Sequence, residues 1–474
     1  MTSAIVVGSG PNGLAAAVRL ARAGVEVTVL EAADTIGGGT RTSEMIVPGL
    51  LHDECSAVHP IAAGSPFLSE LDLARHGLEW LHPEVDCAHP LDDGSAGVMY
   101  RSIDRTADEL GVDGSRWRRV FGSPARHFDD VFADASQPVL HVPRHPLALA
   151  RFGAVAALPA TALARAWTGE QAKSLWAGVA AHALTRLDRP MTSAVGTMLV
   201  VAGHAEGWVV AAGGSQSIAR AMVAELELHG GTVVTGCDVA SYDDIPPHDA
   251  LLLDLSPRNA ADILGDRLPR RVAKSYRRYR HGPGAFKVDF AVSEGVPWTA
   301  EAARVAGTVH LGGGHAEVFA SEAAVSRGAM PERPFVLVGQ QYLADPSRSA
   351  DDVHPVWSYA HVPNGFTGDA TEAVIAQIER FAPGFRERIV GTAVRSTTEM
   401  SRYNANYVGG DIIGGASSPW QLVFRPRFSP RPYSTGVPST YLCSASTPPG
   451  AGAHGMCGAN AAARALADLQ RQNS

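Results

Sequence analysis

Lysine is scarce in this sequence of 474 residues. Only Lys173, Lys274 and Lys287 occur, so arginine supplies nearly all of the positive charge. The 48 Asp and Glu residues outnumber the 40 Lys and Arg residues, for a formal net charge of −8. A chain without a basic run lacks the charge that phosphate contacts require, which excludes nucleic acid as a partner.

Cysteines and long apolar runs are also few. The five cysteines lie far apart and form no CxxC pair, which excludes a disulfide framework, a dithiol redox pair and a zinc ribbon. No apolar run reaches the ~18 residues that span a bilayer, and the N-terminus does not resemble a secretion signal. We therefore expect a cytoplasmic protein, with attachment to a membrane surface and the oligomeric state left open.

The clearest motif lies in the first 31 residues. An apolar strand, a turn with Gly8, Gly10 and Gly13, an alanine-rich helix and a second strand ending at Glu31 follow one another. In such a unit the three glycines serve the tight turn, the approach to a pyrophosphate and the packing of helix on strand. The helix N-terminus faces the phosphates, and the acid accepts hydrogen bonds from a ribose. The spacing predicts dinucleotide binding.

A second glycine-rich loop, from Gly37 to Arg41, follows closely. Gly38 and Gly39 would let backbone approach a phosphate, and the guanidinium of Arg41 would pair with it bidentately. Proteins that bind FAD in an extended form often have such a loop, which NAD-only dehydrogenases do not need. The alternative is a flexible surface loop.

The rest of the chain predicts an α/β fold with a Rossmann-type domain built from separated segments. There is no second GxGxxG, and a glycine-rich loop containing Ser446 opens the last helix, where free N–H groups could face a flavin. We expect a discontinuous FAD-binding domain and an inserted mixed α/β substrate domain. The former comprises 1–74, 206–269 and 406–474, and the latter 75–205 and 270–405.

The stretch from Pro146 to Trp167 is unusually apolar but is interrupted by Arg151, Pro159 and Arg165. These interruptions exclude a transmembrane helix. A buried core helix is the favoured interpretation, with a substrate-tunnel lining or a membrane-surface patch as alternatives.

Taken in order, the motifs resemble those of one family. The carriers are Gly8 to Gly13 with Glu31, Gly37 to Arg41, Gly207-Trp208 through Ser215, Phe286 to Asp289, and the ending from Gly450 to Ala462. The chain is similar to the phytoene-desaturase-like FAD oxidoreductases of the flavin amine oxidase superfamily, in the subgroup of pyridine nucleotide-disulphide oxidoreductase domain-containing proteins. The resemblance covers essentially the whole chain, and its motifs are specific for FAD but not for a substrate.

The resemblance implies further site residues. Val239 matches the backbone contact to adenine, and Gly455 with Met456 matches the loop beneath the flavin's pyrimidine edge. Lys287 lies where amine-oxidase relatives place a lysine that reaches flavin N5 through a water; a strand lysine that faces solvent is the alternative.

Two histidines complete the catalytic candidates. His59 follows the second glycine-rich loop in a segment that, by resemblance, passes near the flavin, and imidazole titrates near the working pH, so His59 is the candidate base. His454 precedes the C-terminal loop glycine and either lines the site or lies on the loop surface.

Two positions depart from the family pattern. Ala212 stands where related sequences often have a basic residue, and Gly455 stands where amine oxidases keep one aromatic wall of the amine cage. Amine oxidation is therefore disfavoured. No metal site is predicted, because Pro143 interrupts the spacing of His141 and His145 on a helical face.

We predict an FAD-dependent oxidoreductase that dehydrogenates the CH–CH bond of a small apolar substrate, carotenoid-, isoprenoid- or lipid-like, by hydride transfer to flavin N5. The electron acceptor, oxygen or a quinone, is undetermined. The alternatives are an isomerase that uses reduced FAD without net oxidation, and a flavin-stabilised binding or scaffold protein with little turnover.

Overall fold

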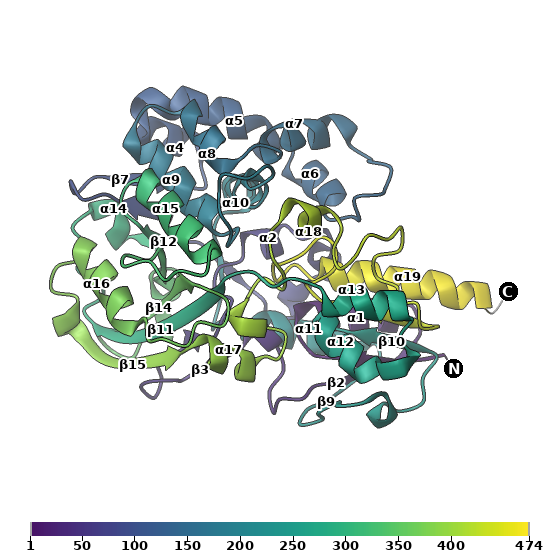
Figure 1. The fold of residues 1–474 in the computed structure, drawn as a ribbon. Helices are drawn as coiled ribbons and strands as arrows, with labels where there is room; N and C mark the ends of the chain where they lie inside the picture. Colours follow the sequence, from purple (N-terminus) through teal and green to yellow (C-terminus); the bar gives the residue numbers. More distant parts are fainter. Residues whose placement is uncertain (1, 473–474) are drawn as a thin grey trace.

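The computed structural model describes residues 2–472 and contains two large sheets that lie side by side, each with its own helices (Figure 1). The first sheet is parallel, in the order β16-β10-β1-β2-β9. Its strands are β1 (Ser3–Val7), β2 (Glu26–Leu30), β9 (Thr232–Val234), β10 (Ala250–Leu253) and β16 (Thr440–Leu442). They come from three separated parts of the sequence.

Helices cover both faces of this sheet, which explains why its central strands are almost wholly apolar. On one face, Ala4 and Val6 pack with α1 (Pro11–Arg22), α11 (Gln216–Leu228) and α19 (Met456–Gln472). On the other face, Ile5 and Val7 pack with α12 (Pro257–Leu264) and α13 (Arg270–Arg277). The domain boundary predicted at 269–270 thus falls between two helices that pack on the same face, and the predicted domain ranges stay a prediction.

The second sheet is mixed, in the order β15-β11-β14-β13-β12-β6-β7, with β12 and β6 the parallel pair. One face packs on the helices of the upper layer in Figure 1, among them α5, α9 and α10, and the other on α16. The strands are β6 (Val85–Pro90), β7 (Ala96–Met99), β11 (Gly284–Ser293), β12 (Ala306–Leu311), β13 (Val336–Gly339), β14 (Val353–Val362) and β15 (Ile389–Arg395).

The remaining elements are short or belong to the helical layer. The longer helices are α4 (Ile103–Glu109), α5 (Gly114–Arg126), α6 (Phe128–Ala135), α7 (Pro146–Ala156), α9 (Glu170–Ala181), α10 (Ser193–Glu206), α15 (His315–Ser326), α16 (Thr371–Phe381) and α17 (Thr397–Tyr403). The short ones are α2 (Pro60–Ala63), α3 (Pro66–Ser69), α8 (Ala160–Leu163), α14 (Glu301–Arg304) and α18 (Pro419–Val423). Two small ribbons pair β3 (Thr42–Ser43) with β4 (His52–Asp53) and β5 (Trp80–Leu81) with β8 (Val210–Ala211).

The predicted α/β class with a Rossmann-type domain is confirmed. Within residues 2–472, no single helix is long and apolar enough to cross a membrane; α7 and the segment 160–166 reach that length only as a pair bent by 90°. The interpretation of α7 as a buried core helix is wrong, because only Phe152 and Ala156 of its eleven residues are buried.

Candidate functional site

The predicted cofactor residues gather where the parallel strands end. β1 runs into Gly8, whose φ of +102° lies in the left-handed region that favours glycine, and its N–H donates to Leu30 O at 2.8 Å. β2 and β9 lie on one side of β1, and β10 and β16 lie on the other, so the strand order reverses at β1. Ligands of open α/β sheets bind in the crevice at such a switch point.

A side chain would not fit at either of the other two glycines of the turn. A Cβ on Gly13 would lie 2.0 Å from Gly8 O, and a Cβ on Gly10 would lie 2.7 Å from an Asp254 carboxylate oxygen. Gly10 is also the N-cap of α1, whose first N–H groups have no partner within the helix. The turn itself therefore carries no side chain at these glycines and presents its backbone, as turns that bind phosphates do.

The second glycine-rich loop folds against this turn. The N–H of Gly37 donates to a backbone carbonyl of the turn at 3.1 Å, and a Cβ on Gly38 would lie 3.0 Å from Gly10 Cα. A Cβ on Gly39 would lie 2.1 Å from the hydroxyl of Tyr407. The two loops therefore form one continuous surface, which does not fit the alternative of an independent surface loop.

Glu31 and Arg41 contact each other directly. Each carboxylate oxygen of the buried Glu31 accepts two hydrogen bonds: Oε2 from Ser9 N at 2.9 Å and Ser9 Oγ at 2.6 Å, and Oε1 from Ala33 N at 2.9 Å and Arg41 Nη2 at 3.1 Å. Arg41 is thus turned toward the predicted ribose acid, and its contact with a phosphate stays a prediction.

Sequence reasoning missed Asp254, the acid that follows β10. Its Oδ2 accepts a hydrogen bond from Gly13 N at 3.0 Å, at the N-terminus of α1. Burial raises the pKa of Asp254 to about 7, and the negative charge of Glu31 adds to the rise. Cys443 and Cys457 are the other titratable groups beside it. The sequence did contain a signal for this residue, because Asp254 directly follows a predicted strand and ligand sites of α/β sheets lie at the carboxyl ends of the strands.

Asp254→Asn is expected to make the unfolding free energy less dependent on pH. The folded pKa lies above that of the unfolded chain, so ionising Asp254 destabilises the fold as pH rises from about 4 to about 7. At pH 8 the variant should be more stable than the unaltered protein by up to about 4 kcal/mol, with no gain below pH 4. Urea denaturation at several pH values measures this, with exposed Asp262→Asn as the control; equal gains at pH 4 and pH 8 would contradict it.

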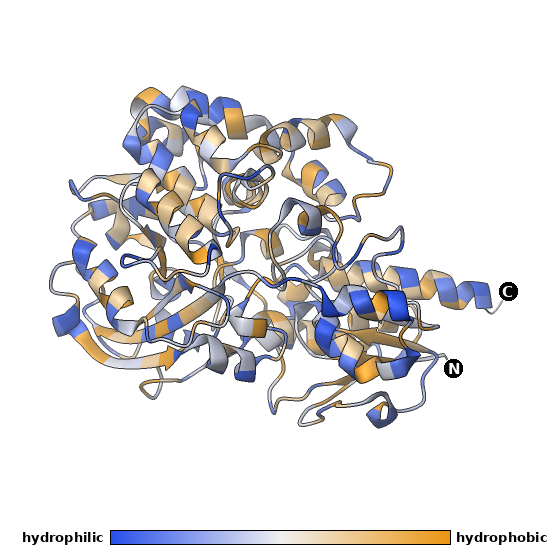
Figure 2. Cartoon of the chain, in the orientation of Figure 1, coloured by the Kyte–Doolittle hydropathy of each residue, from blue (hydrophilic) through white to orange (hydrophobic). Residues whose placement is uncertain are grey.

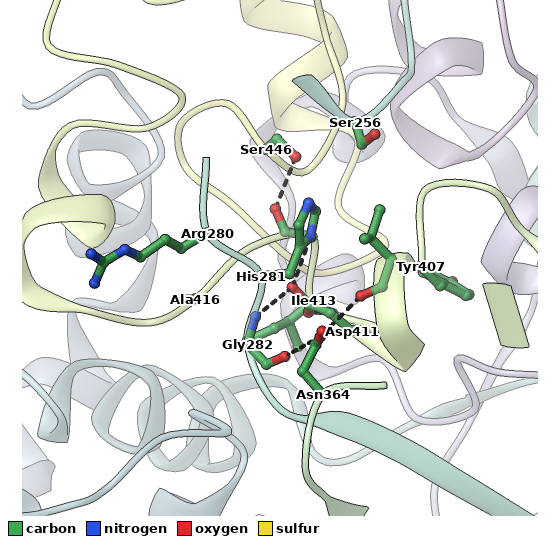
Figure 3. A network of polar contacts seen from close by, with 12 residues as sticks. Ser256, Arg280, His281, Gly282, Asn364, Tyr407, Asp411, Ile413, Ala416 and Ser446 are labelled. Carbon is green, nitrogen blue, oxygen red and sulfur yellow. Dashed lines mark hydrogen bonds and ion pairs between the residues drawn. The ribbon is translucent and has the colours of Figure 1, made fainter. Parts of the chain in front are cut away.

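Val239 and Ser446 are also buried, in the part of the protein that surrounds the parallel sheet. Val239 packs in the apolar cluster on the face of the sheet that carries α12. Ser446 follows β16, and its hydroxyl donates to Gly414 O at 2.8 Å. Figure 3 shows this contact beside the carboxylate of Asp411, which accepts hydrogen bonds from Gly282 N at 2.9 Å and Ile413 N at 3.0 Å. The loop before α18 is therefore fixed on Ser446.

Gly455, Met456 and His454 form the entrance to α19. Gly455 has a φ of +69°, and a Cβ there would lie 2.8 Å from Ala15 Cβ on α1. The N–H of Met456 donates to His454 Nδ1 at 3.0 Å. His454 is buried, so the loop-surface alternative does not hold, and burial lowers its pKa to about 4. A neutral His454 thus caps the helix beside α1.

His59 is held by the Gly-Gly-Ser loop. Its Nε2 lies 2.7 Å from Ser215 Oγ, and Ser215 N donates to Asp53 Oδ1 at 2.7 Å. Burial lowers the pKa of His59 to about 4; Asp53 opposes this effect and Arg348 adds to it. The imidazole is therefore neutral at pH 7, and the expectation that it titrates near the working pH is wrong, because the sequence does not show this desolvation.

A buried arginine fixes the same loop, and sequence reasoning missed it. Arg348 Nη1 donates to Asp53 Oδ2 at 2.5 Å and Nε to Asp345 Oδ2 at 3.1 Å. Asp345 also accepts a hydrogen bond from Gly213 N at 2.8 Å. Both ends of the Gly213–Ser215 loop are thus bound to carboxylates that share one guanidinium.

Lys287 lies on β11 and is only 1 % exposed, so it is not a strand lysine that faces solvent. Its ammonium donates to the Asp289 carboxylate and lies 5.3 Å from the centroid of the Trp357 ring. Burial lowers the pKa of Lys287, and the carboxylate of Asp289 opposes the shift. Within residues 2–472, the side chains of His59, Lys287 and His454 lie in three separate hydrogen-bond networks.

No metal site is found among the described residues. His141 and His145 instead pair with carboxylates, His141 Nε2 lying 3.4 Å from Asp134 Oδ1 and His145 Nδ1 3.2 Å from Asp130 Oδ1.

Comparison with known proteins agrees with this geometry. A model of the NAD(P)-binding Rossmann-like domain matches residues 6–65. Pyridine nucleotide-disulfide oxidoreductase domain-containing protein 2 of Rattus norvegicus is 23% identical, over 98% of this chain and 94% of its own. Hydroxyneurosporene desaturase of Cereibacter sphaeroides is 31% identical over 32% of this chain and 31% of its own. The structure of cyclohexylamine oxidase from Brevibacterium oxydans matches with a TM-score of 0.58 and 17% identity, over 99% of this chain and 100% of that one.

These matches confirm the predicted resemblance, and the relatives and structural neighbours that match are oxidoreductases. They also agree with a site for a flavin or nucleotide cofactor. The disulfide in the name of the rat protein has no counterpart here, since all five cysteines are free thiols.

Proposed function

We propose that the chain is an FAD-dependent dehydrogenase of an apolar, isoprenoid- or lipid-like substrate, because it resembles one oxidoreductase over 98% of its length and a carotenoid desaturase over 32%. The observation that carries the proposal is the contact between the two glycine-rich loops at the switch point of the parallel sheet. An extended dinucleotide would lie along this surface, with its pyrophosphate at Gly10, its ribose at Glu31 and its flavin end toward Gly455.

A buried polar atom at the turn supports this fit. Asn12 lies in the first turn of α1, and its Oδ1 has no hydrogen-bond partner among the described residues although it is buried. Buried side-chain polar atoms are normally satisfied. The amide of Asn12 is therefore available to a group that the nucleotide would bring, and its orientation can reverse to donate to a phosphate.

FAD supplies a hydride acceptor at N5, and the protein must orient the substrate and receive a proton. We assign the proton to His59, whose ring is neutral and whose Nε2 is held by Ser215 Oγ. Lys287 is the second candidate, since burial lowers its pKa and Asp289 lies within reach of its ammonium.

An aliphatic substrate fits better than an amine. Amine-oxidase relatives place an aromatic wall where this chain has Gly455. Here the positive φ and the 2.8 Å approach to Ala15 Cβ leave no space for an aromatic side chain. A cation without that wall would lose its cation–π contact, which favours oxidation of a CH–CH bond.

The alternatives, a reduced-FAD isomerase and a flavin-stabilised scaffold, differ in what happens to the flavin. The purified protein should absorb near the general flavin bands, at about 375 and 450 nm, and release FAD on denaturation. Isoprenoid polyenes in detergent, added without oxygen, should bleach the 450 nm band, and oxygen or a quinone should restore it. His59→Gln should slow the bleaching about 10²- to 10⁴-fold.

The matched control is His127→Gln, which changes an exposed histidine of the helical layer and should leave the rate unaltered. Substrate conversion only after chemical reduction would favour the isomerase. A melting temperature that rises with FAD, without bleaching or conversion, would favour the scaffold. A colourless protein that takes up no added FAD would refute the proposal.

A further inference from the structure

Two segments far apart in the sequence expose large apolar side chains on one side of the protein. The first is the segment from Pro138 to Leu147, which comprises the loop before α7 and the start of that helix; Val142 is 90% and Leu147 76% exposed. The second is α18 with its following loop, where Trp420 is 62% and Phe428 63% exposed. Figure 2 shows the hydrophobic residues along the loop between α6 and α7. We call these two segments together the apolar rim.

The two parts of the apolar rim are neighbours. Val139 and Leu140 of the first segment and Phe424 and Pro430 of the second line the same surface depression. A second groove, of about 340 Å³, lies at the start of α7 and is lined by Asp130, His145, Leu147 and Arg151, among others. Exposed apolar side chains gathered on neighbouring segments mark an interaction site more often than a chance feature.

The aromatic side chains of the rim pack against one another at the surface and are not buried in the core. The rings of Trp420 and Phe424 lie 4.5 Å apart, and those of Phe424 and Phe428 5.0 Å apart, centroid to centroid. Tryptophan is typical of the interface between lipid and water. The rim therefore presents a preformed aromatic ridge.

The charge of the rim opposes that of the whole chain. No Asp or Glu occurs from 135 to 169 or from 412 to 467, although the chain has a net charge of −8. Arg144, Arg151 and Arg431 are exposed within these stretches. Asp130, which lines the groove beside α7, pairs with His145. An apolar surface bordered by exposed arginines complements an anionic lipid surface.

We propose that the apolar rim docks the protein on an anionic lipid bilayer, with Val142, Leu147, Trp420 and Phe428 entering the headgroup region and the arginines contacting phosphates. A symmetric contact between two copies would bring the same arginines together, which like-charge repulsion disfavours.

The rim is joined to the candidate site. Arg425 follows α18, is buried, and donates from Nη1 to Ala445 O at 3.0 Å, next to Ser446. The segment after α18 is therefore tied to the loop of Ser446, one of the predicted flavin contacts. This link to an apolar substrate rests on the proposed function; lipid binding by the rim does not.

The test is sedimentation of the full chain with vesicles of about 30% phosphatidylglycerol in phosphatidylcholine. We expect the protein to sediment with these vesicles, and the bound fraction to fall at about 0.5 M NaCl. Val142→Asp combined with Phe428→Asp should weaken binding at least about tenfold, since apolar burial is lost and two carboxylates are added. Arg144→Gln and Arg431→Gln should each weaken it about fivefold.

Val390→Asp is the matched control, because Val390 is an exposed valine on β15, outside the rim. It should bind vesicles like the unaltered protein, and all variants should keep the same melting temperature and flavin content. No sedimentation with vesicles, or equal loss in Val390→Asp, would overturn the proposal. If light scattering shows a dimer, and the double variant Val142→Asp with Phe428→Asp is a monomer, then the rim binds a second copy of this chain and not a bilayer. If the protein binds vesicles through the rim but neither contains nor takes up FAD, the proposed function is refuted and the lipid-docking proposal stands.

Discussion

Gly10→Val is expected to lower the affinity of the protein for FAD at least about 100-fold. A Cβ at this position already lies 2.7 Å from the Asp254 carboxylate, and the two further methyl groups would fill the cradle between the turn and Gly38. The valine would also displace Asp254 from the N–H of Gly13. Flavin absorbance of the purified variant, followed by fluorescence titration of the apoprotein with FAD, measures the loss.

Gly153→Ala is the matched control, since a Cβ there meets no atom within 4 Å on α7. It should retain the full flavin content. Gly10 is a better test position than Gly13, where even a single Cβ would lie 2.0 Å from a backbone oxygen and would deform the turn itself. A Gly10→Val protein that melts normally and carries a full complement of flavin would show that the cofactor does not bind at this turn.

The strand–turn–helix unit could be predicted because its causes are local. The apolar strand, the glycines and the alanine-rich helix follow one another within about twenty residues, and each glycine is required by an atom of the same unit or of its neighbour in the sheet. The order of glycine-rich segments also predicted that the first sheet would be built from separated pieces. β9, β10 and β16 join β1 and β2 as expected.

The polar network around the Gly-Gly-Ser loop could not be predicted, because its partners are distant in the sequence. Asp53 and Arg348 are 295 residues apart and meet inside the protein. The low pKa of His59 has the same origin, since it depends on burial produced by several elements. For α7, composition indicated apolar character but could not tell a core contact from an exposed face; Leu147 and Phe152 lie on the same short helix with opposite environments.

Arg348→Leu is expected to be the most destabilising single substitution among those proposed, lowering the unfolding free energy by about 3–5 kcal/mol. The variant would leave Asp53 and Asp345 without the guanidinium they share. It would also release the loop that holds His59, so bleaching of the flavin by substrate should slow as well. Urea denaturation and the melting temperature measure the first effect, and anaerobic kinetics the second.

The pH dependence of this deficit separates lost charge pairing from lost packing. Burial alone would raise the pKa of Asp53, but Arg348 and the hydrogen bonds from Ser215 and Thr42 lower it below the usual value. The stability due to ionised Asp53 is therefore present above pH ~4 and is lost as pH falls through the lowered pKa. The deficit of Arg348→Leu should accordingly be largest near pH 7 and shrink in acid, where a protonated Asp53 needs no cation.

The control Arg118→Leu, which removes an exposed ion pair with Asp104, should show no measurable change at any pH. A deficit for Arg348→Leu that does not shrink even below pH ~4, where Asp53 becomes protonated, would mean that Arg348 acts through packing and not through its charge.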